Sequence, residues 1–311
     1  MNANASPATA HRATGLGRFI RPWALLAGLC GPLVSPGSSP AGEVALMPTR
    51  LHVSIPPGQD YTHVLQVTYG KDGPADTAPV RLVLTAEDWD QSIDGNMTFT
   101  RTDPTEESAR PWLVLSPTEQ EFVPGESGDV RVSIMVPEDA VPGEYRCALI
   151  LQPRVPYRAL REGEKRLDVR LRLSTVIYVE VPPVRAEADL VGLDVVAGEK
   201  GWVIHSTITN SGQAHLRLTD EYEVYDLSGL APTDPNLDAP LVVRGDAAEA
   251  GIVLPAHDRY FDRPFEDFSL YPGTFRLVYR VDTGRELPLL VGEKVFEIPE
   301  PMPAVATDVA P

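Results

Sequence analysis

Cysteine, basic residues and long apolar runs are all scarce in this sequence of 311 residues. The 27 lysines and arginines are outnumbered by 44 aspartates and glutamates, and the formal net charge of −17 excludes a nucleic-acid binder that works by electrostatic attraction. Beyond residue 41 no apolar stretch approaches the roughly 20 residues that a membrane-spanning helix needs. Proline and glycine, by contrast, number 31 and 24, so we expect many short elements and no long helix.

The two cysteines, Cys30 and Cys147, cannot form a disulfide in the mature chain, because we expect Cys30 to leave with a signal peptide. Cys147 alternates with apolar residues in the segment EYRCALIL, which predicts a buried thiol rather than a reactive one. Stability must therefore come from burial of hydrophobic residues, which make up 43% of the sequence.

Motifs that carry catalysis or metal binding are also missing. The six histidines show no spacing typical of a zinc site, and no glycine-rich phosphate loop is present. Residues 125–129 (GESGD) and 282–284 (DTG) are similar to fragments of protease motifs, but each is better explained as a turn. The aspartates of residues 88–94 are out of register for a calcium loop, and Asp94-Gly95 predicts a hairpin turn instead. We expect no enzyme activity, no cofactor and no small-molecule substrate.

The N-terminal segment has the composition of a secretory signal. Three arginines precede an apolar run at residues 23–34, and small residues then lead to a predicted cleavage site after Ala41. The sequence thus predicts a signal peptide at residues 1–41 and an exported protein, periplasmic or secreted. Lipidation of Cys30 is the lesser alternative.

Alternating apolar and polar residues recur in short runs bounded by proline, glycine and aspartate, which is typical of β-sandwiches. In the first half of the chain the predicted strands are 50–55, 61–69, 79–86, 129–136, 144–152 and 166–181. In the second half they are 190–196, 202–209, 214–219, 221–227, 274–281 and 286–298. No amphipathic helix longer than about two turns is found, so the predicted fold class is all-β.

A double proline, Pro182-Pro183, separates the two sets of strands. We expect two tandem immunoglobulin-like β-sandwich domains, at residues 42–183 and 184–298. A tail rich in proline and alanine follows at residues 299–311.

An internal similarity supports duplication of one sandwich unit. Residues 141–149 (VPGEYRCAL) and 271–279 (YPGTFRLVY) share a Pro-Gly corner, an aromatic residue and an arginine before an apolar strand. Another proline turn lies upstream of each segment, at Pro124 and at Pro255, with nearly the same separation. Paired spacing of this kind favours two related domains over a chance match.

The predicted strand at residues 166–181 is longer than the others, with apolar residues or threonine at its odd positions. Ordinary strands have five or six residues, so part of this one must overhang, bend or pair with something else. The loop before it, residues 153–166, carries five basic and two acidic side chains. That loop is either a docking patch or a solvated connection whose charges protect an edge strand from aggregation.

Four segments of the first half carry a resemblance to a known family. They are PTRLHVSI, ARPWLVLSPTEQEFVPGESGDVRVSI, GEYRCALILQP and the long alternating strand. In these segments the chain resembles the periplasmic chaperones of the chaperone–usher class, which assemble pili or fimbriae and have two immunoglobulin-like domains. The resemblance covers most of residues 46–183 and, more faintly, 184–298.

The resemblance implies that the long strand is lent to an incomplete pilin subunit, which is addition of a strand at a sheet edge. Val169, Leu171 and Leu173 match the family's donor residues. Arg50 matches the arginine that holds the subunit's terminal carboxylate. The family's companion lysine is replaced by Val176, so half of the expected anchor is missing.

We therefore expect a non-enzymatic periplasmic chaperone. Its partners would be pilin-like protein subunits with exposed β edges and an outer-membrane usher, with no nucleic acid involved. The alternative is a secreted or cell-surface structural protein that uses its immunoglobulin-like domains as spacers or scaffold contacts. A stable one-to-one complex with a small β-rich subunit would distinguish the chaperone from the scaffold.

Overall fold

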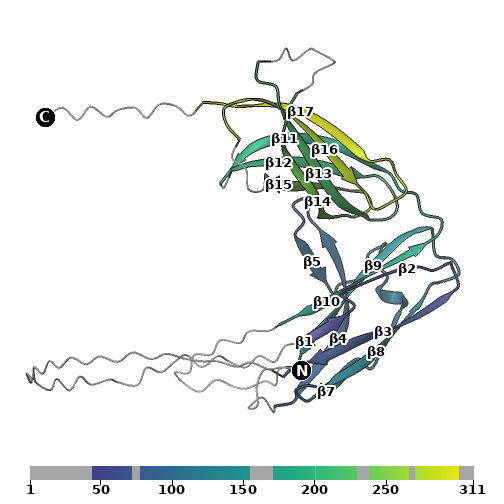
Figure 1. The fold of residues 1–311 in the computed structure, drawn as a ribbon. Helices are drawn as coiled ribbons and strands as arrows, with labels where there is room; N and C mark the ends of the chain where they lie inside the picture. The colour runs from purple at the N-terminus through teal and green to yellow at the C-terminus, as the bar shows by residue number, and fades with distance from the viewer. Residues whose placement is uncertain are drawn as a thin grey trace, which may run out of the picture. The chain divides into compact units, whose positions relative to one another are not determined.

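The computed structural model describes residues 44–71, 78–154, 171–199, 201–229, 239–265 and 270–300. Within these ranges the chain forms the strands β1 to β17 and one short 3-10 helix, η1 (Arg110–Trp112). The predicted all-β fold class, with two tandem β-sandwiches, is confirmed (Figure 1). The predicted signal peptide and most of the predicted tail lie outside the described residues.

The first sandwich, a name we use for β1 to β10, consists of two facing sheets. One sheet has the order β1 (Val44–Met47), β3 (Asp60–Tyr69), β8 (Ser127–Met135), β6 (Leu113–Ser116). The other has the order β2 (Arg50–Ser54), β10 (Leu173–Val181), β9 (Gly143–Pro153), β4 (Val80–Gln91), β5 (Met97–Thr100), with β7 (Glu119–Phe122) also paired to β4. Their inward faces enclose a core in which Leu65, Val132, Leu149 and Ile177 are fully buried.

The second sandwich, β11 to β17, encloses a separate core around Phe275 and Leu277. Its smaller sheet has the order β11 (Ala188–Gly198), β12 (Gly201–Asn210), β15 (His257–Pro264). Its larger sheet has the order β14 (Leu241–Val253), β13 (Leu216–Asp226), β16 (Gly273–Asp282), β17 (Leu290–Ile298). The described residues contain no helix with the length and apolar character that crossing a membrane requires.

The internally similar segments occupy corresponding places in the two sandwiches. Residues 141–149 lead into β9, and residues 271–279 lead into β16. Each of these strands follows a strand of the opposite sheet, β8 or β15, and each lies between two partners in the larger sheet of its sandwich. The Pro-Gly corner therefore has one role in both halves, which is to return the chain to the other sheet.

The three motifs that we explained as turns lie at turns, although residues 127–129 of the GESGD segment already belong to β8. Ser92 and Asn96 close the β4–β5 hairpin, with Gly95 at φ +84°. Gly125, at φ +89°, precedes β8, and Gly284 donates its N–H to Asp282 after β16. Positive φ values of this kind favour glycine, because a Cβ atom would clash with the backbone.

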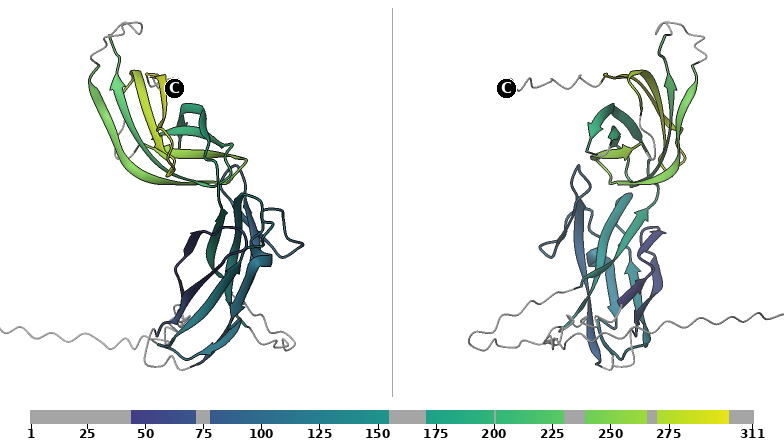
Figure 2. Two further views of the ribbon diagram at one scale, coloured as in Figure 1. Left: turned by 90° about the vertical axis from the view of Figure 1, so that its right-hand side faces the viewer. Right: turned by 60° about the vertical axis from the view of Figure 1, so that its left-hand side comes forward.

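The predictions missed six strands: the short strands β1, β5, β6 and β7 of the first sandwich and the long strands β14 and β15 of the second. Register shifts against β13 interrupt the alternation of β14, and the strand bends along its length (Figure 2). In β15 only Phe261 is buried, and charged residues dominate its sequence. Strands without a continuous apolar face give no period-two signal, because neighbouring strands and not their own side chains define them.

Candidate functional site

The chain changes sheets between β1 and β2, and this crossing defines the site. β1 pairs with β3 in one sheet of the first sandwich, whereas β2 pairs with β10 in the other. Pro48 and Thr49 connect them, and the Thr175 hydroxyl donates to the Pro48 carbonyl oxygen at 2.8 Å. Because β2 begins only at Arg50, it cannot cover the part of β10 that comes before Val176.

Two strands flank β10, but they cover different lengths of it. β9 pairs with all of β10, from Leu173 to Val181. β2 pairs only with Val176–Glu180. Within the described part of the chain, the first three residues of β10 therefore have a partner strand on one edge only. We call the other edge of residues 173–175 the open edge.

Backbone groups of Ser174 face the open edge. Val176 donates its N–H to the Thr49 carbonyl oxygen at 3.1 Å, so the backbone of Val176 points toward the β2 side. Backbone direction alternates along a strand, and Ser174 lies two positions earlier, so its N–H and C=O point to the same side. Among the described residues no backbone group pairs with Ser174 on this side, so the open edge offers a donor and an acceptor to an added strand.

The predicted donor residues lie at this end of β10. Leu173 is half-buried and packs against the core of the first sandwich, whereas 53% of Leu171 is exposed. Val169 lies outside the described residues. The prediction that residues 166–181 form one strand is corrected in the described part, because Leu171 and Arg172 precede β10 and are not in a strand.

There is a physical reason why β10 begins only at Leu173. The register of β9 and β10 pairs Leu173 with Leu151, so Leu171 would lie opposite Pro153, the last residue of β9. Proline has no N–H to donate, and the ladder stops there. Arg172 instead forms an ion pair with β4, in which its Nη2 lies 2.7 Å from both carboxylate oxygens of Glu87.

The predicted anchor, Arg50, lies beside the open edge. It is exposed, it begins β2, and its register partner on β10 is Val176. The structure thus places Arg50 opposite the residue that stands where the family has its lysine. Among the described residues, no hydrogen bond or ion pair engages the Arg50 guanidinium, so it is available to an incoming carboxylate.

Sequence reasoning missed that the even-numbered face of β10 is also buried. Tyr178 packs in an apolar cluster with Trp89 and Ile150 of the first sandwich and Leu254 of the second. Described residues of both sandwiches thus contribute to this cluster. The polar residues at even positions predicted a solvent-facing side, and only the neighbouring sandwich explains its burial.

A polar cluster adjoins Tyr178. Glu180 accepts a hydrogen bond from Nε2 of His52 at 2.8 Å and forms an ion pair with Arg285 at 2.7 Å. Burial by itself would raise the pKa of Glu180, but His52 and Arg285 outweigh it and lower that pKa to about 2. Glu144 accepts from both the backbone N–H and Nδ1 of His215, and burial lowers the pKa of that imidazole.

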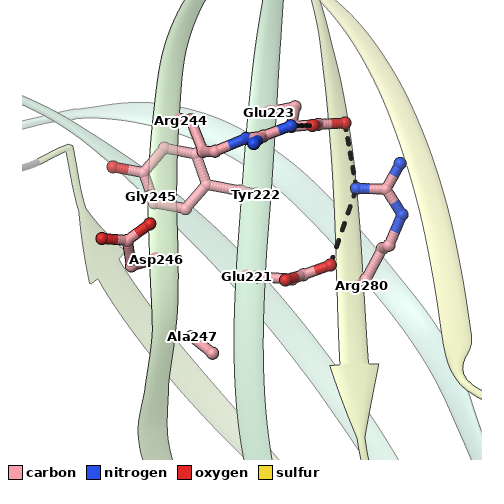
Figure 3. Close-up of a pocket in the computed structure, with 8 residues that line it drawn as sticks. All are labelled: Glu221, Tyr222, Glu223, Arg244, Gly245, Asp246, Ala247 and Arg280. Atoms are coloured by element: carbon pink, nitrogen blue, oxygen red, sulfur yellow. Dashed lines mark hydrogen bonds and ion pairs between the residues drawn. The ribbon is translucent and has the colours of Figure 1, made fainter.

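A second polar site lies on the larger sheet of the second sandwich (Figure 3). Its cavity has a volume of about 230 Å³ and is lined by Glu221, Tyr222, Glu223, Arg244, Gly245, Asp246, Ala247 and Arg280. Arg244 and Arg280 both bind the carboxylate of Glu223, and Arg280 also approaches Glu221. These charged side chains pair with one another and so stabilise the sheet. We assign the cavity no ligand.

Glu223 makes the second sandwich sensitive to acid. Hydrogen bonds from Arg244, Tyr225 and Arg280 lower its pKa to about 2, against about 4.3 for a free glutamate. The stability that this carboxylate contributes is therefore complete above about pH 4.3 and is lost as the pH falls toward 2. We expect Glu223→Gln to lower the free energy of unfolding at pH 7 and to make no difference at pH 2, as measured by urea unfolding across this range.

The control for this prediction is Glu293→Gln, which changes an exposed glutamate on β17. This control should track the unchanged protein at every pH. A constant difference between Glu223→Gln and the unchanged protein from pH 7 to pH 2 would contradict the assignment.

The comparison with known proteins found similar solved structures but no matching family model or curated protein. The crystal structure of the class 5 fimbriae chaperone CfaA is 11% identical with a TM-score of 0.41, covering 83% of this chain and 100% of that one. The E. coli chaperone DraB is 11% identical with a TM-score of 0.39, covering 81% and 98%.

The Pseudomonas aeruginosa CupB2 chaperone is 13% identical with a TM-score of 0.37, covering 83% of this chain and 100% of that one. These three proteins are chaperones, and the motifs of the first half resemble fimbrial chaperones of the chaperone–usher class.

Proposed function

We propose that this protein is an exported, non-enzymatic chaperone that binds incomplete β-sandwich subunits of a surface fibre. The observation that carries the proposal is the open edge of β10 with the unengaged Arg50 beside it. An extended client segment would take the place on β10 that β2 leaves uncovered. Backbone hydrogen bonds would fix its register, as in other additions of a strand to a sheet edge.

The direction of the client follows from the strands already present. β2 runs parallel to β10, and Arg50 is its first residue. A client segment that is also parallel to β10 would run toward Arg50 and end there. Its terminal carboxylate would then meet the guanidinium, and a charge-assisted hydrogen bond of this kind is about twice as strong as a neutral one.

Apolar side chains would supply the remaining affinity. Leu171 is largely exposed and Leu173 is half-buried, and both are odd-numbered residues at the edge of the core. Val169, outside the described residues, continues the same alternation. These side chains would fill the groove of a client that lacks one strand of its own. Full burial of an exposed leucine contributes about 1.5–3 kcal/mol, and these partly covered leucines would gain roughly half of that.

Co-purification tests the proposal. The full chain isolated from the periplasm should carry a small β-rich subunit in a one-to-one complex, and Leu171→Glu should abolish that complex. The reason is that a carboxylate cannot enter an apolar groove without losing its hydration. Size-exclusion chromatography with mass measurement provides the readout.

The matched control is Leu289→Glu, because Leu289 is 52% exposed and lies in the second sandwich beside Thr219 and Arg280. This variant should keep the complex. A Leu171→Glu variant that retains every partner would show that the open edge is not the binding site. It would favour a scaffold protein built from tandem sandwiches.

A further inference from the structure

Two carboxylates face each other on neighbouring strands of the first sandwich. Glu144 on β9 and Glu180 on β10 are register partners. His52 on β2, the next strand of the same sheet, lies beside them. One ligand atom from each of the three side chains lies within 4.8 Å of the others. Like charges directly opposite each other in a sheet are destabilising, so this arrangement needs a compensating positive charge.

One carboxylate oxygen in this group has no partner. The side chain of Glu144 is completely buried, with 0% of it exposed. Its Oε2 accepts the two hydrogen bonds from His215, but its Oε1 has no hydrogen-bond partner in the described part of the chain. A buried carboxylate oxygen with neither a hydrogen-bond donor nor a cation beside it destabilises the fold. Oε1 of Glu144 therefore marks a place where a donor or a cation is missing.

The neighbouring charges do not balance. Arg285 lies 2.7 Å from Oε1 of Glu180 and 3.8 Å from Oε2 of Glu144, and the described residues show no other arginine or lysine in an ion pair with either. With both imidazoles neutral, two carboxylates and one guanidinium leave a net charge of −1. A cation bound on the Oε1 side of Glu144 would supply the missing positive charge.

We propose that His52, Glu144 and Glu180 form a binding site for a divalent transition metal ion, with Zn²⁺ as the best match. Imidazole nitrogen and carboxylate oxygen are ordinary zinc ligands, whereas calcium and magnesium prefer oxygen alone. The metal ion would lie between Nε2 of His52 and Oε1 of Glu180, and the Nε2 proton would move to Nδ1 of the same ring. The side chain of His52 is 40% exposed and provides the route from solvent.

The bound ion would link three adjacent strands of the larger sheet of the first sandwich. β2 carries His52 two residues after Arg50, β10 carries Glu180 and β9 carries Glu144. Metal binding would therefore stabilise β2 against β10. This inference stands on the three side chains and does not depend on the proposed chaperone function.

Titration of the metal-stripped full chain with ZnCl₂ tests the site. We expect one Zn²⁺ per chain by calorimetry and a higher melting temperature with the ion bound. His52→Ala should abolish this binding. Glu144→Gln should weaken it at least about tenfold, because it removes a charged ligand.

The matched control is His205→Ala. His205 has the same exposure, 39%, and also pairs with a carboxylate, that of Asp262 at 2.7 Å, but it lies on the second sandwich. This variant should bind Zn²⁺ like the unchanged protein. Because His52 is 40% exposed and is not part of a hydrophobic core, its replacement leaves the core intact and gives a clear answer even where Glu144→Gln does not fold.

Three results would overturn the proposal. They are no stoichiometric binding of Zn²⁺, equal binding by His52→Ala, and equal or tighter binding of Ca²⁺ or Mg²⁺. A cluster that binds a proton but no metal ion would show no stoichiometric binding of Zn²⁺.

Discussion

Replacing Arg263 with methionine should lower the free energy of unfolding by about 3–5 kcal/mol, the largest loss that we expect from a single polar substitution in this protein. The reason is Asp220, which is 2% exposed in the second sandwich. Its Oδ1 binds Nη1 of Arg263 at 2.8 Å. Without the guanidinium, a buried carboxylate would remain with its charge uncompensated.

The network around Asp220 joins the two sheets of the second sandwich. Arg263 belongs to β15 in the smaller sheet, whereas Asp220 belongs to β13 in the larger one. Tyr279 on β16 donates its hydroxyl to Oδ2 of Asp220 at 2.6 Å, and the guanidinium of Arg263 lies over the ring of Tyr222. Loss of Arg263 would thus remove a link between sheets as well as a charge.

Chemical unfolding followed by tryptophan fluorescence measures this effect. The control is Arg217→Met, which breaks the more exposed pair of Arg217 with Glu249 and should cost less than about 1 kcal/mol. The double variant Arg263→Met, Asp220→Leu should recover much of the loss, because no unpaired charge remains. A cost below about 1 kcal/mol for Arg263→Met alone would contradict the role that we give to Asp220.

Replacing Ser174 with proline should abolish strand addition at the open edge while leaving the protein folded. Proline removes the N–H that faces this edge, and its ring blocks the approach of another backbone. The pairing of β10 with β9 uses the opposite edge and should survive, since proline is tolerated where its nitrogen faces solvent on an edge.

A peptide of ten alternating leucines and serines with a free C-terminal carboxylate is a suitable probe. Calorimetry should show binding to the unchanged protein and at least about tenfold weaker binding to Ser174→Pro, because the edge loses a hydrogen bond and its access. Ser174→Ala is the matched control, because it keeps the N–H and should bind normally. The amidated peptide should bind more weakly as well, because Arg50 then has no carboxylate to hold.

Thermal unfolding shows whether Ser174→Pro is folded. Should it unfold, Leu171→Glu provides the same test from a residue outside the strand. Equal binding of the peptide to the unchanged protein and to folded Ser174→Pro would place the docking edge elsewhere.

Local patterns in the sequence predicted most strands of the described fold. Runs such as residues 61–69 and 129–136 became β3 and β8 because their apolar side chains alternate, and alternation is sufficient for a strand with one face in a core. Cys147 was predicted to be buried and is completely buried. Positions such as Gly95 and Gly125 predicted turns because few other residues adopt their backbone conformation.

The candidate site could be predicted from the sequence only in part. Leu171, Leu173 and Arg50 were identified through a family resemblance, but no local pattern shows that β2 begins too late to cover the start of β10. That depends on where the chain crosses between sheets and on Pro153 ending β9. Such pairings join residues more than a hundred positions apart, as Arg50 and Val176 are.

By itself the sequence determined the all-β class and most strand positions, since each depends on side chains only a few residues apart. Tertiary structure alone decided which edge of β10 stays open, that Tyr178 and Glu180 are buried, and that His52 meets Glu144 and Glu180. The physical reason is that burial and charge pairing depend on neighbours brought together by folding. No periodicity within one strand specifies what will cover its outer face.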